Sequence, residues 1–237
     1  KDERDLNDYK TKTDWENEVF NLLGLEPETE YFLRITALHG DLTESVPGES
    51  VSATTALSTM SFRIGLGYED GENINYNSPH EIIFDESFQI TRGANVISSD
   101  RLIWTLINTN SANGISLVQR GEHGGMYNDD AEYTITSISG NLDEQTEGIG
   151  LKNFFISQLY NDNETQGSLS SLVPENEYDS EQTNSVGLID TIFRKTYESD
   201  GPIHTGETSL GIKTKASLAT PEGNYFEDIT FVLIAKY

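Results

Sequence analysis

Oxygen-bearing side chains alternate along one polar stretch of the chain in the order that a calcium-binding loop uses. Asp162, Glu164 and Gln166 occupy the first, third and fifth positions, and Gly167 follows at the sixth. Calcium is held by several oxygen ligands, and acidic loops with a glycine at the sharp turn supply them. Val173 stands at the twelfth position, where such a loop carries an acid, so this is not an intact EF-hand loop.

Two further acidic pairs are candidates for the same chemistry. They are Asp70 with Glu72, and Asp129 with Asp130. We predict calcium as the one inorganic partner, bound at one or more of these three places. A hydrated turn is the alternative for each of them, because Asp and Asn are also typical turn residues.

Asn163 begins the only intact Asn-x-Ser/Thr sequon, Asn163-Glu-Thr165, in the same polar stretch. A glycan on Asn163 would compete with calcium for this loop.

Side chains suited to catalysis do not form a recognisable constellation. The four histidines are scattered, and His80-Glu81 lacks the second histidine that a zinc-protease helix carries at the fourth position. The glycines of Gly121-Glu-His-Gly-Gly125 have no phosphate-binding lysine beside them and predict bends or bulges. The absence of cysteine excludes disulfides, thiolate metal sites and cysteine nucleophiles. We therefore predict that the chain is not an enzyme.

The charge balance restricts the partners. Fifteen basic and forty acidic residues give a formal net charge of −25, which repels phosphate backbones and anionic lipids. No apolar stretch approaches the ~20 residues of a membrane helix. We expect no nucleic-acid partner and no membrane insertion, and a surface that is either simply solvated or collects divalent cations.

Short strands must position these residues. Segments rich in β-branched and aromatic residues are separated by Gly, Asn, Asp and Ser, and they cover residues 61–67, 80–84, 102–107, 115–118, 132–138 and 229–235. Residues 151–160 and 186–195 fit short helices or strands equally well. The pattern predicts an all-β sandwich or barrel.

Two details of this sheet follow from the pattern. Asn113-Gly114 between two apolar segments predicts a hairpin. Apolar residues on both faces of 229–235, including Val232 and Ile234, predict a central strand covered on both sides.

The stretch from Leu25 to Ala37 reads as a corner and a strand. Pro27 and Thr29 set the turn, Tyr31 lies where its hydroxyl can bond back across it, and Leu33, Ile35 and Ala37 continue at period two. With Val51-Ser-Ala53-Thr-Thr55 as a closing strand, residues 15–57 resemble the second half of a fibronectin type III domain, a sandwich of about 100 residues. An ordinary hairpin is the alternative.

Two later segments resemble the β-sandwich modules of bacterial exported surface proteins. They are Asn108-Thr-Asn with Gly114 and Leu117, and Thr220-Pro-Glu-Gly-Asn-Tyr225 followed by Ile229-Thr-Phe231. The chain has only a single Trp-x-Leu, at Trp104, and so departs from wall-binding domains that carry a pair.

These observations predict two domains, a partial fibronectin type III-like (FN3) immunoglobulin-like sandwich at 1–57 and a second, larger β-sandwich surface or assembly domain at 58–237. The missing strands of the first belong to a longer parent protein or come from another segment. We expect an extracellular, cell-surface, non-catalytic structural or adhesive module of a prokaryote, such as a filament or surface-layer subunit that self-associates by β-strand pairing or binds other surface proteins.

The alternative is a carbohydrate-binding or accessory module of a secreted glycan-active enzyme. Loop tyrosines are its candidate glycan contacts, namely Tyr68, Tyr76, Tyr127, Tyr160 and Tyr178. A hydrolase in its own right is a third hypothesis, because paired carboxylates occur in any chain this acidic.

The calcium hypothesis makes a direct prediction about stability. A cation that binds only the folded chain raises its melting temperature, so we expect a higher midpoint in calcium than in chelator. Calorimetry of the same sample in both buffers tests this, with magnesium as the ionic-strength control. Equal midpoints in calcium and in chelator would contradict the prediction that the folded chain binds calcium.

Overall fold

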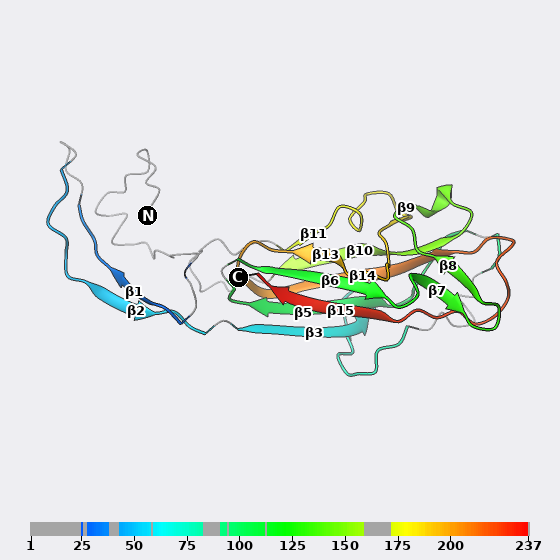
Figure 1. Cartoon of the computed structure of the whole chain (residues 1–237), viewed down its shortest axis with the longest axis horizontal. Coiled ribbons are helices and arrows are strands. Elements are labelled where there is room, and N and C mark those ends of the chain that lie inside the picture. The colour runs from blue at the N-terminus through cyan, green and yellow to red at the C-terminus, as the bar shows by residue number, and fades with distance from the viewer. Residues whose placement is uncertain are drawn as a thin grey trace.

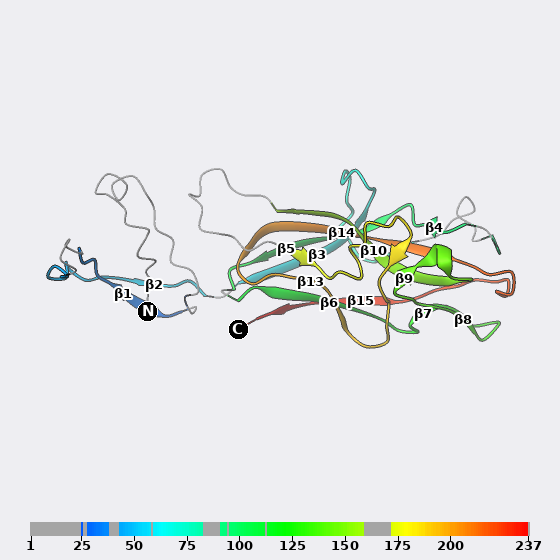
Figure 2. The ribbon, with the colours of Figure 1, turned by 90° about the horizontal axis from the view of Figure 1, so that it is seen from above.

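The computed structural model describes residues 25, 28–37, 43–57, 59–82, 91–93, 95–111, 113–158 and 172–236. Strands dominate these residues, and the one named helix among them is a short 3-10 turn, η2 (Leu142–Glu144). Two antiparallel sheets lie face to face, as the two layers of Figure 2 show. The prediction of an all-β sandwich is therefore confirmed (Figure 1).

The first sheet has the strand order β10-β14-β5-β3. Its strands are β10 (Gly148–Gln158), β14 (Ile203–Lys215), β5 (Leu102–Thr109) and β3 (Met60–Gly67). A fifth strand, β4 (Ile97–Ser98), pairs with β14 beyond the end of β5.

The second sheet has the order β11-β13-β6-β15. Its strands are β11 (Val173–Pro174), β13 (Arg194–Glu198), β6 (Ile115–Gly121) and β15 (Ile229–Ala235). Three two-stranded pairs complete the described residues: β7 (Gly125–Asn128) with β8 (Tyr133–Thr136), β9 (Gly140–Asn141) with β12 (Ser185–Val186), and β1 (Glu30–Leu33) with β2 (Val51–Thr54).

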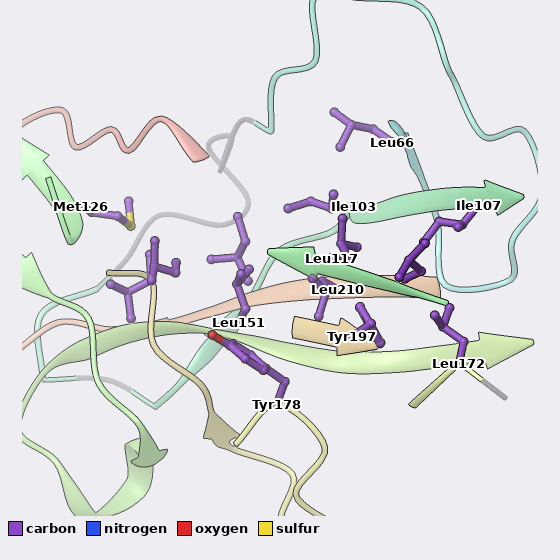
Figure 3. Packing of buried hydrophobic residues seen from close by; sticks show 14 of the residues in the cluster. Leu66, Ile103, Ile107, Leu117, Met126, Leu151, Leu172, Tyr178, Tyr197 and Leu210 are labelled. Atoms are coloured by element: carbon purple, nitrogen blue, oxygen red, sulfur yellow. The ribbon is translucent and has the colours of Figure 1, made fainter. Parts of the chain in front are cut away.

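The core lies between the two sheets and follows the period of two. Ile103, Ile107 and Leu210 project from the first sheet, while Leu117 and Tyr197 project from the second (Figure 3). All five are buried. Because burying one such aliphatic or aromatic side chain contributes about 1.5–3 kcal/mol, this shared cluster holds the layers together.

The outer face of β5 is also covered. Trp104 is buried there, its indole N–H donates to the Tyr68 carbonyl at 3.1 Å, and its ring lies 5.3 Å from that of Phe155. The turn after β3 brings Gly71 over the indole, where an added Cβ would lie 3.2 Å from Trp104. Because both faces of β5 are covered in this way, the strand is apolar on both faces.

The two sides of the sandwich are closed differently. Along β10, Leu151 and Gly187 exchange backbone hydrogen bonds of 3.0 and 2.8 Å, and Asn153 N–H donates to the Tyr178 carbonyl. That edge is therefore covered. On the other side, β3 and β15 are the terminal strands of their sheets, and β3 is bridged only at Leu66, by Asn75, among the described residues.

The structure decides between the alternatives that the sequence left open, and it corrects one expected strand. Residues 151–158 belong to strand β10, and residues 186–195 contain parts of β12 and β13, so the strand alternative holds for both segments. His80, Glu81 and Ile82 lie outside any strand, and the rest of the expected strand 80–84 lies outside the described residues.

Asn113-Gly114 makes a turn, but not a hairpin. Gly114 adopts a φ of +76°, as an Asn-Gly turn requires, yet β5 and β6 belong to different sheets. Both strands present an apolar face to the core, so they lie opposite one another across it and the turn joins the layers.

Strand β15 lies at an edge, not in the centre. It pairs with β6 alone, and its outward side chains Val232 and Ile234 are exposed. The second neighbour of β6 is β13, which leaves β15 at the margin. An apolar run shows that both faces are apolar, but it does not show that strands flank both edges.

The β1–β2 pair comes from the segment that resembles a fibronectin domain. Tyr31 lies opposite Ala53 and Leu33 opposite Val51 in antiparallel register. At the corner, Thr29 N–H donates to Thr55 Oγ1, and Thr55 N–H donates to the Thr29 carbonyl, both at 3.0 Å. Pairing of these two segments agrees with the predicted strands but does not identify the family.

Gly114→Ala tests the sheet-to-sheet turn. An added Cβ would lie 2.2 Å from the Ser199 carbonyl oxygen and would also strain the positive φ, so we expect a loss of about 2–4 kcal/mol in the free energy of unfolding. Gly140→Ala is the matched control, because Gly140 has a φ of +130° but no atom within 4 Å of the added Cβ. We expect this control to lose only the cost of its strained φ, about 1–3 kcal/mol, and therefore less than Gly114→Ala. Equal losses in urea unfolding would contradict steric contact at Gly114.

Candidate binding groove

A cavity of about 1010 Å³ lies on the side of the sandwich between β3 and β15. Its walls are the inner faces of these edge strands, through Ile64 and Leu66 on one and Ile229 and Phe231 on the other. Its floor is the core itself, reached at Ile103, Met126, Ile135, Ile149 and Ile212. We call this cavity the edge groove.

The rim of the edge groove is polar and mostly acidic. Arg92 pairs with Glu222 at 2.5 Å, while Glu81 and Asp228 also line the opening. The segment between the lining residues Ile82 and Thr91 lies outside the described residues. An apolar floor under an acidic rim favours the binding of an apolar or cationic ligand group and disfavours the binding of an anion.

One carboxylate organises the wall of the edge groove from within. The side chain of Glu227 is only 4% exposed, and its oxygens accept backbone hydrogen bonds from Glu122 at 2.7 Å, His123 at 3.0 Å and Gly125 at 2.7 Å. These N–H groups belong to the glycine-rich turn between β6 and β7. Such charge-assisted bonds are stronger than neutral ones, so Glu227 fastens this turn to the start of β15.

His123 is fixed beside this carboxylate by aromatic contacts. Its ring stacks on Tyr127 with centroids 4.9 Å apart and meets Phe226 edge-on at 5.2 Å. His123 Nδ1 is buried without a hydrogen-bond partner and lies 3.6 Å from Glu227 Oε1, too far for a hydrogen bond. We therefore assign His123 a packing role.

A second carboxylate ties the floor to the rim. Glu147, in the bend just before β10, accepts hydrogen bonds from Tyr133 at 2.5 Å and Thr220 at 2.6 Å. Burial acts to raise the pKa of Glu147, but the hydrogen bonds from Thr220, Tyr133 and Ser217 outweigh it and lower the pKa. The hydrogen bond to Glu147, with burial, raises the pKa of the Tyr133 hydroxyl. Both groups thus hold their ordinary charge states at neutral pH.

The predicted metal residues do not come together in the part of the chain that the structure describes. Asp70 accepts the Glu72 backbone N–H at 3.0 Å in the exposed turn after β3. Asp129 and Asp130 lie in a different exposed turn, the one between β7 and β8. Across the described ranges no three His, Asp or Glu side chains form a metal-binding group. Asp162, Glu164, Gln166 and Asn163 lie outside these ranges.

The tyrosines proposed as glycan contacts divide into two groups. Tyr68 is exposed, with the Arg101 guanidinium 4.5 Å from its ring, and Tyr76 is half-buried under Arg63. Tyr178 is fully buried and its hydroxyl donates to the Leu188 carbonyl, so its assignment as a loop contact was wrong. Tyr127 packs on His123, and Tyr160 lies outside the described residues.

Sequence reasoning did not find the edge groove or Glu227. The glycine-rich turn was visible at 121–125, but its carboxylate partner lies 102 residues beyond Gly125. The floor collects single residues from five strands, and the walls add two more strands. No local spacing connects residues so far apart in the chain.

Comparisons with protein-family models, with curated proteins and with solved structures found no match for this chain. The resemblances to a fibronectin type III domain and to bacterial surface modules therefore remain predictions from the residues quoted above. No helix in the described ranges is long and apolar enough to cross a membrane.

Glu227→Gln tests the buried carboxylate. The amide keeps the shape but turns an NH2 group toward backbone donors, so we expect a loss of about 2–4 kcal/mol in the free energy of unfolding. Glu222→Gln is the control, because Glu222 is 82% exposed and we expect a change below about 0.5 kcal/mol. Urea unfolding of both variants measures the difference, and similar small losses would show that Glu227 is not a structural anchor.

Proposed function

We propose that the chain is a non-catalytic structural or adhesive module of a prokaryotic cell surface, and that it associates with further copies of itself. The β1–β2 pair carries this proposal, because it leaves large apolar side chains in water. Phe32 in β1 is 68% exposed, and in the segment between β1 and β2 Ile35 is 72% and Val46 88% exposed. Large exposed apolar side chains gathered in one segment are a mark of interaction sites.

A two-stranded pair of this size is marginally stable by itself in water. The β1–β2 pair lies away from the larger sandwich, at one end of the elongated molecule (Figure 1). A partner that covers its apolar side would supply the buried area that the pair lacks.

The connection to the sandwich directs the pair outward. Asn110 Nδ2 donates to the Leu57 carbonyl at 2.9 Å, and Asn110 Oδ1 accepts the Thr59 N–H at 2.6 Å. These bonds hold the linker at the Met60 end of β3. The edge groove begins at Ile64 and extends past Leu66, toward the opposite end of that strand.

This polarity supports head-to-tail association. The apolar β1–β2 pair of one copy would lie against the open β3 and β15 side of the next, in the manner of strand addition. Contacts between different surfaces on successive copies do not close and so generate filaments. With a net charge of −25 per chain, association should strengthen as salt screens repulsion.

A carbohydrate-binding function is the second candidate. Its support is an aromatic group on the outer face of the first sheet, where exposed Tyr68 and Phe155 flank the buried Trp104. Exposed aromatic rings beside Arg101 present the mixed apolar and polar surface to which sugar rings bind.

The double variant Phe32→Ser/Ile35→Ser tests self-association. We expect the unaltered chain to form species larger than a monomer at micromolar concentration in 0.5 M salt, and the variant to shift at least about tenfold in apparent Kd toward monomer. Light scattering after size-exclusion chromatography measures this.

Ile192→Ser is the matched control for that experiment, since Ile192 is 61% exposed but lies in the bend before β13 and does not line the edge groove. If the unaltered chain is a monomer at every salt concentration, the proposal of self-association is wrong. Binding to polysaccharides that is lost in Tyr68→Ala would then favour the carbohydrate function.

A further inference from the structure

The outer face of the first sheet holds a buried amine. Lys213 on β14 is only 5% exposed, although this acidic chain has few basic residues to bury. Its Nζ donates to Ser98 Oγ at 2.9 Å and lies 3.4 Å from the side-chain oxygen of Asn184. No carboxylate forms an ion pair with this amine among the described residues.

The amide beside this amine is held from three directions. Asn184 Nδ2 donates to Asp143 Oδ2 at 3.0 Å, and the Asn184 carbonyl accepts the Leu142 N–H at 3.0 Å. Two residues later, Val186 packs where a Cβ on Gly150 would lie, and Gly150 is the β10 partner of Lys213. The Lys213 amine, the Asn184 amide and the Asp143 carboxylate thus lie in a row, in this order.

The surroundings favour the neutral, nucleophilic amine. Burial lowers the pKa of Lys213, and the positive charge of Lys152 lowers it further, against weaker opposing effects of Asp143 and Glu69. The Phe154 ring lies 5.8 Å from Nζ and adds apolar surface. Desolvation and a neighbouring cation are the two ways in which proteins activate lysine as a nucleophile.

We propose that Lys213 and Asn184 join in an intramolecular amide cross-link. The neutral Lys213 Nζ attacks Asn184 Cγ, the Nζ–Cγ bond forms, and the Cγ–Nδ2 bond breaks with release of ammonia. The proton that Nζ loses leaves with the departing nitrogen, so atoms and charge balance without an oxidant or a further reactant. The hydrogen-bonded arrangement described above is the state before this reaction.

Asp143 is positioned to assist the proton transfer. Its carboxylate already accepts a hydrogen from Nδ2, the atom that must leave as ammonia. Once the Nζ–Cγ bond has formed, a carboxylate at this point can take up the proton of Nζ and deliver it to the leaving nitrogen, which is general acid–base catalysis in one turnover.

The link would join the central strand β14 to the segment before β12, 29 residues away in the chain. That segment covers the β10 edge of the sandwich. The chain has no cysteine, so an amide is the covalent brace that its side chains can supply. Closing a loop of this length restricts the unfolded chain much as a disulfide does.

Intact-mass spectrometry of the folded full-length chain tests the proposal. We expect a mass about 17 Da below that of the sequence, equal to one ammonia, and a peptide digest in which Lys213 and Asn184 occur in one branched fragment. The full sequence mass, retained after days at pH 9 in the folded state, would overturn the proposal.

Variants separate the cross-link from other losses of ammonia. Lys213→Arg and Asn184→Ala should each restore the full mass of their own sequences. Lys152→Arg is the matched control and should keep the deficit, because Arg keeps the positive charge and the Lys152 Nζ partners in the described part of the chain are the carbonyls of Ser180 and Gln182. A deficit that persists in Lys213→Arg would indicate a succinimide at an asparagine and would also overturn the proposal.

Discussion

Burial of Ile103, Ile107 and Leu210 against Leu117 and Tyr197 is the interaction on which the rest of the molecule depends. It places β5 and β6 in different layers, although the chain connects them by a turn of a few residues. Once these two strands face each other, their remaining neighbours follow, and β3 and β15 become the terminal strands of the two sheets. The edge groove is the direct consequence, because no strand among the described residues closes the side between these two terminal strands.

Hydrogen bonds of polar side chains hold the turns and segments that the hydrophobic core does not fix. The three backbone N–H groups bound by Glu227 and the two hydroxyls bound by Glu147 anchor the turns that end in the groove wall. On the outer face, Lys152 and Lys213 fasten the segment that covers the β10 edge. Breaking one of these bonds would leave a buried polar group without a partner, which destabilises a fold. The bonds therefore restrict the loops that carry them.

The two surfaces proposed to associate differ in character. Asn110 holds the linker to the apolar β1–β2 pair at the Met60 end of β3, whereas the edge groove opens on the side of the sandwich, toward the other end of β3. This asymmetry explains why assembly through unlike surfaces is a more natural proposal for the chain than symmetric pairing.

The sequence by itself determined the all-β class, the positions of β3, β5, β6, β8 and β15, and the left-handed turn at Gly114, since these depend on side-chain period and local sterics. Only the tertiary structure decided that this turn crosses between sheets, that β15 lies at an edge, and that residues 151–158 are a strand. Strand order depends on which apolar faces meet across the core. The same is true of Glu227 with its glycine-rich turn and of Lys213 with Asn184, because these contacts join residues far apart in the chain.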